Sequence, residues 1–279
     1  MISINKIALD YGPRKEVFST PPLANIEMSE FESAFLCGLL RKFKPKKIVE
    51  CGVAAGGTTA IILKCLENIG QEYSMKSIDI SEVYYRDKSV KAGSLAEPIK
   101  ADLKFGTHEF YLGTVLPLVI DEVGGDIDFL ILDTTHSMPG EGLDFMVALP
   151  YLKENAVVCM HDVSLNQRVQ FKDSHATTAL FSAVTANKFL NFFLDENLNP
   201  TYPNIAAFQI TEDTMKNIEN VFLTLILRWR YLPDYPHLRA YTEMLMRHYP
   251  SELFMIFQEA LRLNLRSLTA EAQLVAQQK

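Results

Sequence analysis

The sequence lacks the features that mark secreted, membrane-spanning or nucleic-acid-binding proteins. It has four cysteines and no Cys-x-x-Cys pair, which argues against a disulfide framework and a zinc site. No apolar run approaches the roughly 18 residues of a membrane span, and the N-terminus has no signal-peptide pattern. Because 27 basic residues face 34 acidic ones, no general attraction to nucleic acid or to an anionic membrane is expected. We therefore expect a cytoplasmic protein.

What is present is the composition of a globular protein. Hydrophobic residues make up 48% of the 279, which is enough for a sizeable core in one large domain with an appendage. A capping-box pattern, Ser29 to Glu32, predicts an N-terminal amphipathic helix that ends near Lys42. We expect three segments: an arm over residues 1–28, an α/β domain over 29–211 and a C-terminal helical extension over 212–279.

The stretch from residue 47 to 59 organises the rest of the chain. A short apolar strand runs through Glu50, Gly52 and Gly56 follow with three small residues between them, and a helical pattern begins at once. This is a strand–tight loop–helix unit of a nucleotide-binding sheet. Glycines there allow a sharp turn and close approach to a ligand. The spacing is not the G-x-G-x-x-G of dinucleotide folds and there is no P-loop lysine, which disfavours an NAD-dependent oxidoreductase.

Four further strands follow in alternation with helices. They are expected at 73–80, 108–113, 128–133 and 156–160, and the alternation predicts a doubly wound, mostly parallel sheet with its ligand site at the carboxyl ends of the strands. Asp79 lies at the tip of the first of these, where a carboxylate binds ribose hydroxyls. The alternative is a solvated acid at a strand end. Two later runs, 189–195 and 205–210, suggest a hairpin at the sheet edge.

Two pairs of polar residues follow neighbouring strands of this sheet. Asp133 and His136 come after one strand, and His161 and Asp162 after the next. Their oxygen and imidazole ligands suit a divalent cation such as magnesium or manganese. Such a cation would lower the pKa of a substrate hydroxyl. The alternatives are that His136 fixes its loop, that His161 bridges to Asp133, and that Asp162 caps the following turn.

The order of these motifs resembles class I S-adenosylmethionine-dependent methyltransferases, and more narrowly the macrocin-type and cephalosporin-pathway branch of small-molecule O-methyltransferases. The resemblance covers roughly residues 30–210 and rests on Glu50-Cys51-Gly52…Gly56, Asp79, Leu132-Asp133-Thr134-Thr135-His136-Ser137 and Leu152-Lys153-Glu154-Asn155…Met160-His161-Asp162-Val163. It implies a seven-stranded Rossmann-like sheet whose last strand is reversed, and S-adenosylmethionine as cofactor. The segment 29–211 is then the methyltransferase domain.

The resemblance also implies roles for individual residues. Glu50, Gly52, Gly56, Asp79 and Gly113 would form the cofactor site, with Gly113 near the adenine. Asp133, His161 and Asp162 occupy the places that hold magnesium in the catechol-type members, and His136 takes the place of the base, as its near-neutral pKa allows. Two departures stand out: His161 replaces an acid, and Asn155 stands where glycine is usual.

The sequence therefore predicts a methyltransferase that acts on oxygen of a sugar or other small hydroxylated metabolite, with Asp133 and His136 as the catalytic residues. In this interpretation a divalent metal assists the transfer of the methyl group. The alternative is a non-catalytic or partner-dependent protein on the same fold, which uses its helical tail for assembly. The amphipathic tail is also compatible with a homo-oligomer.

Overall fold

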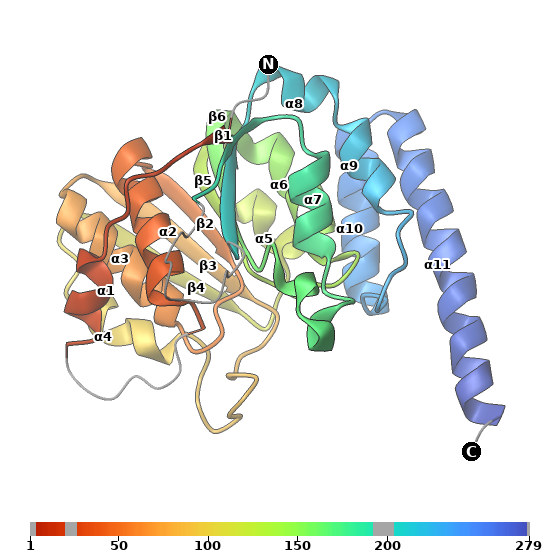
Figure 1. The fold of residues 1–279 in the computed structure, drawn as a ribbon, viewed down its shortest axis with the longest axis horizontal. Helices are drawn as coiled ribbons and strands as arrows, with labels where there is room; N and C mark the ends of the chain where they lie inside the picture. The colour runs from red at the N-terminus through yellow and green to blue at the C-terminus, as the bar shows by residue number, and fades with distance from the viewer. Residues whose placement is uncertain (1–3, 20–26, 192–203, 278–279) are drawn as a thin grey trace.

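The fold is an eight-stranded sheet between two helical layers, seen in the computed structural model of the chain (Figure 1). The structure describes residues 4–19, 27–191 and 204–277. The strands are β1 (Ile4–Asn5), β2 (Lys47–Cys51), β3 (Tyr73–Asp79), β4 (Gly106–Leu112), β5 (Ile127–Leu132), β6 (Leu152–His161), β7 (Asn187–Phe189) and β8 (Ile205–Gln209). Their order in the sheet is β1-β7-β8-β6-β5-β2-β3-β4.

The helices connect and cover these strands. They are α1 (Gly12–Val17), α2 (Glu30–Phe43), α3 (Gly57–Ile69), α4 (Glu97–Lys100), α5 (Leu116–Val123), α6 (Gly140–Ala148), α7 (Ala176–Ala183), α8 (Glu212–Lys216), α9 (Glu219–Thr224), α10 (Tyr235–His248) and α11 (Ser251–Gln277). Short 3₁₀ turns lie at Ser94–Ala96, Leu149–Tyr151, Leu165–Gln167 and Val169–Phe171. Among the described residues, no helix is both long and apolar enough to cross a bilayer.

The sheet is parallel except at one strand. β2 through β6 pair in parallel, and β8 runs antiparallel to both β6 and β7. The predicted mostly parallel seven-stranded sheet is confirmed in β2–β8. The reversed strand β8 pairs antiparallel with β7, as the sequence suggested, and only β1 lies beyond this pair at the sheet edge. An eighth strand, β1, adds to β7 in parallel. Most of the predicted strand 189–195 falls outside the described residues.

Side-chain alternation along the strands divides the core into two layers. Ile48, Phe129 and Val157 pack with α2 and α3, whereas Val49 and Leu130 face α5, α6 and α7, since successive residues of a strand point to opposite faces. The C-terminal helices α9, α10 and α11 lie outside this second layer (Figure 1) and join the same core cluster.

Two local features of the sequence have the backbone geometry expected of them. The Ser29 hydroxyl accepts from the Glu32 backbone N–H at 3.3 Å, and Glu32 Oε2 accepts from the Ser29 N–H at 2.6 Å, so the predicted capping box begins α2. Asn155 adopts φ 67°, a left-handed conformation that asparagine tolerates far better than most residues. This explains how asparagine stands where the resemblance leads one to expect glycine.

Candidate active site

The glycine loop between β2 and α3 is shaped by contacts within the chain. Gly52 has φ 95°, and a Cβ there would lie 1.8 Å from the Asp133 carbonyl oxygen. Gly56 has φ 90°, and its Cβ would lie 2.7 Å from Gly93 Cα. Glycine is therefore required at both positions by the protein's own backbone as well as by the turn. The loop residues 52–55 and the start of α3 line a large cavity.

Asp79, at the tip of β3, holds this loop in place. Its Oδ2 accepts hydrogen bonds from the backbone N–H groups of Val53 at 2.8 Å and Ala54 at 3.0 Å, and its Oδ1 accepts from Ser81 N–H at 2.8 Å. Asp79 also lines the cavity. Each carboxylate oxygen accepts more than one hydrogen bond, so these contacts leave capacity for a ligand. Ribose binding by Asp79 stays a prediction.

Glu50 lies beneath the loop and contacts protein. It is fully buried, and its Oε2 accepts from the Thr59 hydroxyl at 2.8 Å and the Ser77 hydroxyl at 2.6 Å. Burial raises the pKa of Glu50 to about 7, partly offset by these two hydrogen bonds. The side chain thus braces β2 against α3 and β3. Glu50, Gly56 and Gly113 are not among the residues that line the cavity, whereas Thr114, next to Gly113, is.

The cavity occupies the carboxyl edge of the sheet, with a volume of about 1210 Å³. This exceeds the roughly 300–1,000 Å³ of common small-molecule pockets, which leaves room for a cofactor and a second ligand. Much of its wall was not predicted from the sequence. Arg14 and residues 27–32 come from the N-terminal side, and residues 231–234, His237 and Tyr241 from the C-terminal helical region. These segments carry no motif that points to a ligand, so only the folded chain brings them to the site.

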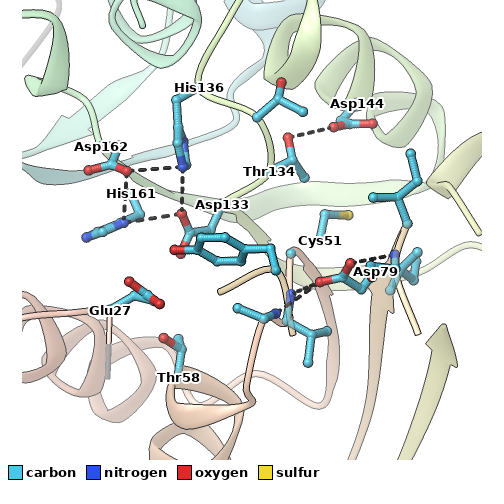
Figure 2. Close-up of a pocket in the computed structure, with 18 of the residues that line it drawn as sticks. Glu27, Cys51, Thr58, Asp79, Asp133, Thr134, His136, Asp144, His161 and Asp162 are labelled. Atoms are coloured by element: carbon cyan, nitrogen blue, oxygen red, sulfur yellow. Dashed lines mark hydrogen bonds and ion pairs between the residues drawn. The ribbon is translucent and has the colours of Figure 1, made fainter. Parts of the chain in front are cut away.

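The polar residues after β5 and β6 converge at one side of the cavity. His136 Nε2 lies 3.1 Å from Asp162 Oδ2 and 3.8 Å from Asp133 Oδ1. Figure 2 shows His136, Asp162 and His161 on one side of Asp133, and Thr134 and Asp144 on the other. His136 and Asp162 both have positive φ, 56° and 59°, which is uncommon outside glycine and typical of functional sites.

His136 is protonated at neutral pH in this arrangement. Burial by itself lowers the pKa of His136, but the hydrogen bond to Glu141 and the charges of Glu141, Asp133 and Asp162 together raise it to about 9. Glu141 is fully buried, and its Oε1 accepts from the His136 backbone N–H at 2.6 Å. The imidazolium therefore cannot accept a proton until it loses its own, which is a condition on the predicted base role.

His161 forms a buried bridge between two acids. Its Nδ1 lies 3.2 Å from Asp133 Oδ1, and its Nε2 lies 3.4 Å from Glu32 Oε1 on α2. Burial lowers the pKa of His161, but the charge of Asp133 and hydrogen bonds to both acids raise it well above its usual value. For Glu32, burial raises the pKa, but the contacts with His161 and Ser29 lower it to about 2. This bridge matches the alternative weighed for His161.

A cation fits the side chains next to this bridge. One ligand atom from each of Asp133, His136 and Asp162 lies within 4.8 Å of the others. Two carboxylates and an imidazole are a donor set for manganese, iron or zinc as well as magnesium. The set differs from the predicted one, because His136 takes the place of His161. The metal role of His161 stays a prediction, and its ring nitrogens are directed at Asp133 and Glu32.

A family model described as a methyltransferase domain matches residues 49–163, from β2 to just past β6. No curated protein matches the chain.

Solved structures resemble the chain at low identity. The methyltransferase PaMTH1 of Podospora anserina, bound to S-adenosylhomocysteine (SAH), is 12% identical with a TM-score of 0.48 over 72% of this chain and 86% of that one. The O-methyltransferase TomG of Streptomyces achromogenes, in complex with SAM, is 18% identical with a TM-score of 0.47 over 74% and 92%. A Bacillus cereus O-methyltransferase with SAH is 16% identical with a TM-score of 0.46 over 71% and 90%.

Proposed function

We propose that this chain, which carries a methyltransferase domain at residues 49–163, transfers the methyl group of S-adenosylmethionine to an oxygen of a small hydroxylated metabolite. One observation carries the proposal. The matched segment folds so that its glycine loop, Asp79 and the polar residues after β5 and β6 all line one cavity. A cofactor and an acceptor bound there would be held side by side, as in-line displacement at a sulfonium requires.

The cofactor end of the cavity is formed by the loop and the tip of β3. The backbone N–H groups at the start of α3, at Gly57 and Thr58, are available to the carboxylate of the amino-acid moiety. Asp79 is the candidate for the ribose hydroxyls. Ile80 follows it, lines the cavity and is 60% exposed, so it offers an apolar surface to the base.

The acceptor end is formed by Asp133, His136 and Asp162. A hydroxyl of the acceptor placed among them would meet two carboxylates and an imidazole. Once His136 is neutral, its ring nitrogen would take the hydroxyl proton, while the carboxylates orient the oxygen toward the methyl group. A sugar or another small polyhydroxylated metabolite suits this polar end. We propose that the chain belongs to the macrocin-type branch of small-molecule O-methyltransferases.

A divalent cation is proposed as an assistant at the same end, held by Asp133, His136 and Asp162. When bound, it would lower the pKa of an acceptor hydroxyl. It would then replace His136 as the means of activation, because a coordinated imidazole nitrogen cannot accept a proton, and the hydroxyl proton would pass to solvent. Binding at His136 displaces the proton that otherwise occupies its nitrogen. His161 would then keep Asp133 oriented from behind, as outer partners of metal ligands do.

The remaining features of the proposal concern the chain as a whole. We place the methyltransferase domain at residues 29–211, the N-terminal arm at 1–28 and the helical extension at 212–279. The protein would work in the cytoplasm, with a small molecule as its partner and no nucleic acid or membrane. A homo-oligomer through the C-terminal helices is compatible with the exposed Met255, Leu263 and Leu265 on α11.

Calorimetric titration tests the proposal directly. We expect SAH to bind with micromolar affinity and NAD not to bind, because the loop spacing suits a mononucleoside. Absence of SAH binding would contradict the proposed function. Activity that survives EDTA and Asp133→Asn unchanged would exclude the cation while leaving methyl transfer intact.

A further inference from the structure

Asp144 on α6 is a buried carboxyl group in the cavity wall that the proposed chemistry does not use. Its side chain is the acceptor of two hydroxyls: Oδ2 accepts from Thr134 at 3.1 Å and Oδ1 from Tyr241 at 2.5 Å. The residue is 5% exposed. In the described part of the chain, no basic side chain forms an ion pair with it. Each carboxylate oxygen can accept more than one hydrogen bond, so the two hydroxyls leave capacity for a ligand in the cavity that Asp144 lines.

The cavity that Asp144 lines also has apolar walls, which suit a flat apolar ligand with a polar edge. Cys51, Ile78 and Leu116 line the cavity and belong to the same buried cluster as Tyr241. Ile78 immediately precedes Asp79, and Leu116 begins the helix after β4. This recess therefore adjoins the proposed ribose site. Figure 2 shows Asp144 and Thr134 on the Asp79 side of Asp133, away from His136.

We propose that Asp144 reads the adenine base of the cofactor, and that Tyr241 of the C-terminal helix α10 is the residue that positions its carboxyl group. The inference rests on the proposed function, since it assigns the base end of the same nucleoside. A protonated carboxyl presents a donor and an acceptor side by side. The Watson–Crick edge of adenine presents the complementary pair, the N1 acceptor beside the amino donor.

The protonation state of Asp144 supports this assignment. Burial raises the pKa of Asp144 to about 7, and the charge of Glu141 adds to the effect, although the hydrogen bonds to Tyr241 and Thr134 partly oppose it. The neutral acid is therefore well populated near pH 7. The proposal also gives the C-terminal helical region a part in the cofactor site: Tyr241 lies on α10, far from the glycine loop in sequence.

The test compares SAH with its 1-deaza analogue, in which a C–H group replaces N1. This analogue removes the acceptor that the carboxyl proton would contact and leaves the amino group and the rest of the molecule unchanged. By calorimetry, the wild-type chain should bind SAH about 10-fold or more tightly than the analogue, since a paired donor and acceptor discriminates on this order. Asp144→Ala should bring the ratio close to one. Tyr241→Phe should lower it by a smaller factor.

The matched control is Asp213→Ala, which removes an exposed carboxylate on α8 and should keep the wild-type ratio. A wild-type ratio near one, or an unchanged ratio in folded Asp144→Ala, would overturn the assignment. If near-UV circular dichroism shows that Asp144→Ala does not fold, the wild-type ratio and Tyr241→Phe decide, and an unchanged ratio in Tyr241→Phe removes its positioning role. Failure of the wild type to bind SAH at all would instead refute the proposed function.

Discussion

At the scale of single residues, the candidate site is built from side chains that support the fold, and some of them also line the cavity. Asp79 accepts three backbone hydrogen bonds from the loop and the turn beside it while it also faces the cavity. Glu50 and His161 are buried, and the hydrogen bonds that they form go to other protein groups. The residues of the sequence motifs therefore hold the fold together, whether or not they also contact a ligand.

Substitution of Asp79 tests both roles together. We expect Asp79→Ala to abolish measurable SAH binding, because the ribose contact and the anchor of the Val53 and Ala54 N–H groups are lost together. The fold should survive, with a stability loss of about 1–3 kcal/mol for the unpaired loop donors. Calorimetry and urea unfolding measure the two effects. Unchanged SAH affinity would remove Asp79 from the site.

Glu50 predicts a pH dependence of stability. Its folded pKa of about 7 lies above the ordinary glutamate value, so the folded state holds the proton more tightly. Stability from this group is fully present below about pH 4.5 and is lost as the pH rises through 7, by on the order of 3 kcal/mol.

Glu50→Gln removes this titration and keeps the shape of the side chain. The variant should gain stability relative to the wild type between pH 5 and pH 8, as urea unfolding at the two pH values would show. A difference between variant and wild type that does not change with pH would mean that Glu50 does not titrate in this range.

At the scale of elements, α2 connects the carboxyl edge of the sheet to the N-terminal part of the chain. Its capping box leaves Glu32 in the first turn, and the same carboxylate reaches His161 at the end of β6. Ser29→Ala removes the hydroxyl that caps the helix, and a loss of about 1 kcal/mol of folding free energy is expected.

Ser182→Ala, at an exposed position in α7, is the control and should change stability by less than about 0.5 kcal/mol. Urea denaturation of both variants is the measurement. Equal stabilities of the two variants would show that the cap contributes nothing to α2.

At the scale of the whole molecule, the C-terminal helices belong to the core. Phe222, Trp229, Leu245 and Phe257 are fully buried and join the cluster that covers α5, α6 and α7. Each such side chain contributes about 1.5–3 kcal/mol, and a domain of this kind is stable by only about 5–15 kcal/mol. The sequence boundary at residue 211 therefore cuts through one hydrophobic core.

Truncation tests this directly. A chain that ends at residue 211 should not fold cooperatively, whereas one that ends at Ser267 should fold, because the residues from 268 to 273 are exposed or half-buried. Circular dichroism during thermal unfolding distinguishes the two cases. A shorter chain that folds and binds SAH would show that the helical extension is dispensable.

The sequence by itself determined the sheet, its parallel order and the loop, because periodicity, glycine placement and strand-end acids are local signals. It also indicated that the polar residues after β5 and β6 lie at one edge of the sheet, since carboxyl ends of parallel strands share an edge.

Only the tertiary structure decided the rest. It pairs His161 with Glu32 from α2 and brings His136 to Asp133 and Asp162. It also places Tyr241 beside Asp144. These contacts join segments separated by up to about 130 residues, and no local pattern encodes which long-range partner a buried charge will find. Burial then determines protonation, so the working states of Glu50, His136 and Asp144 follow from packing rather than from residue type.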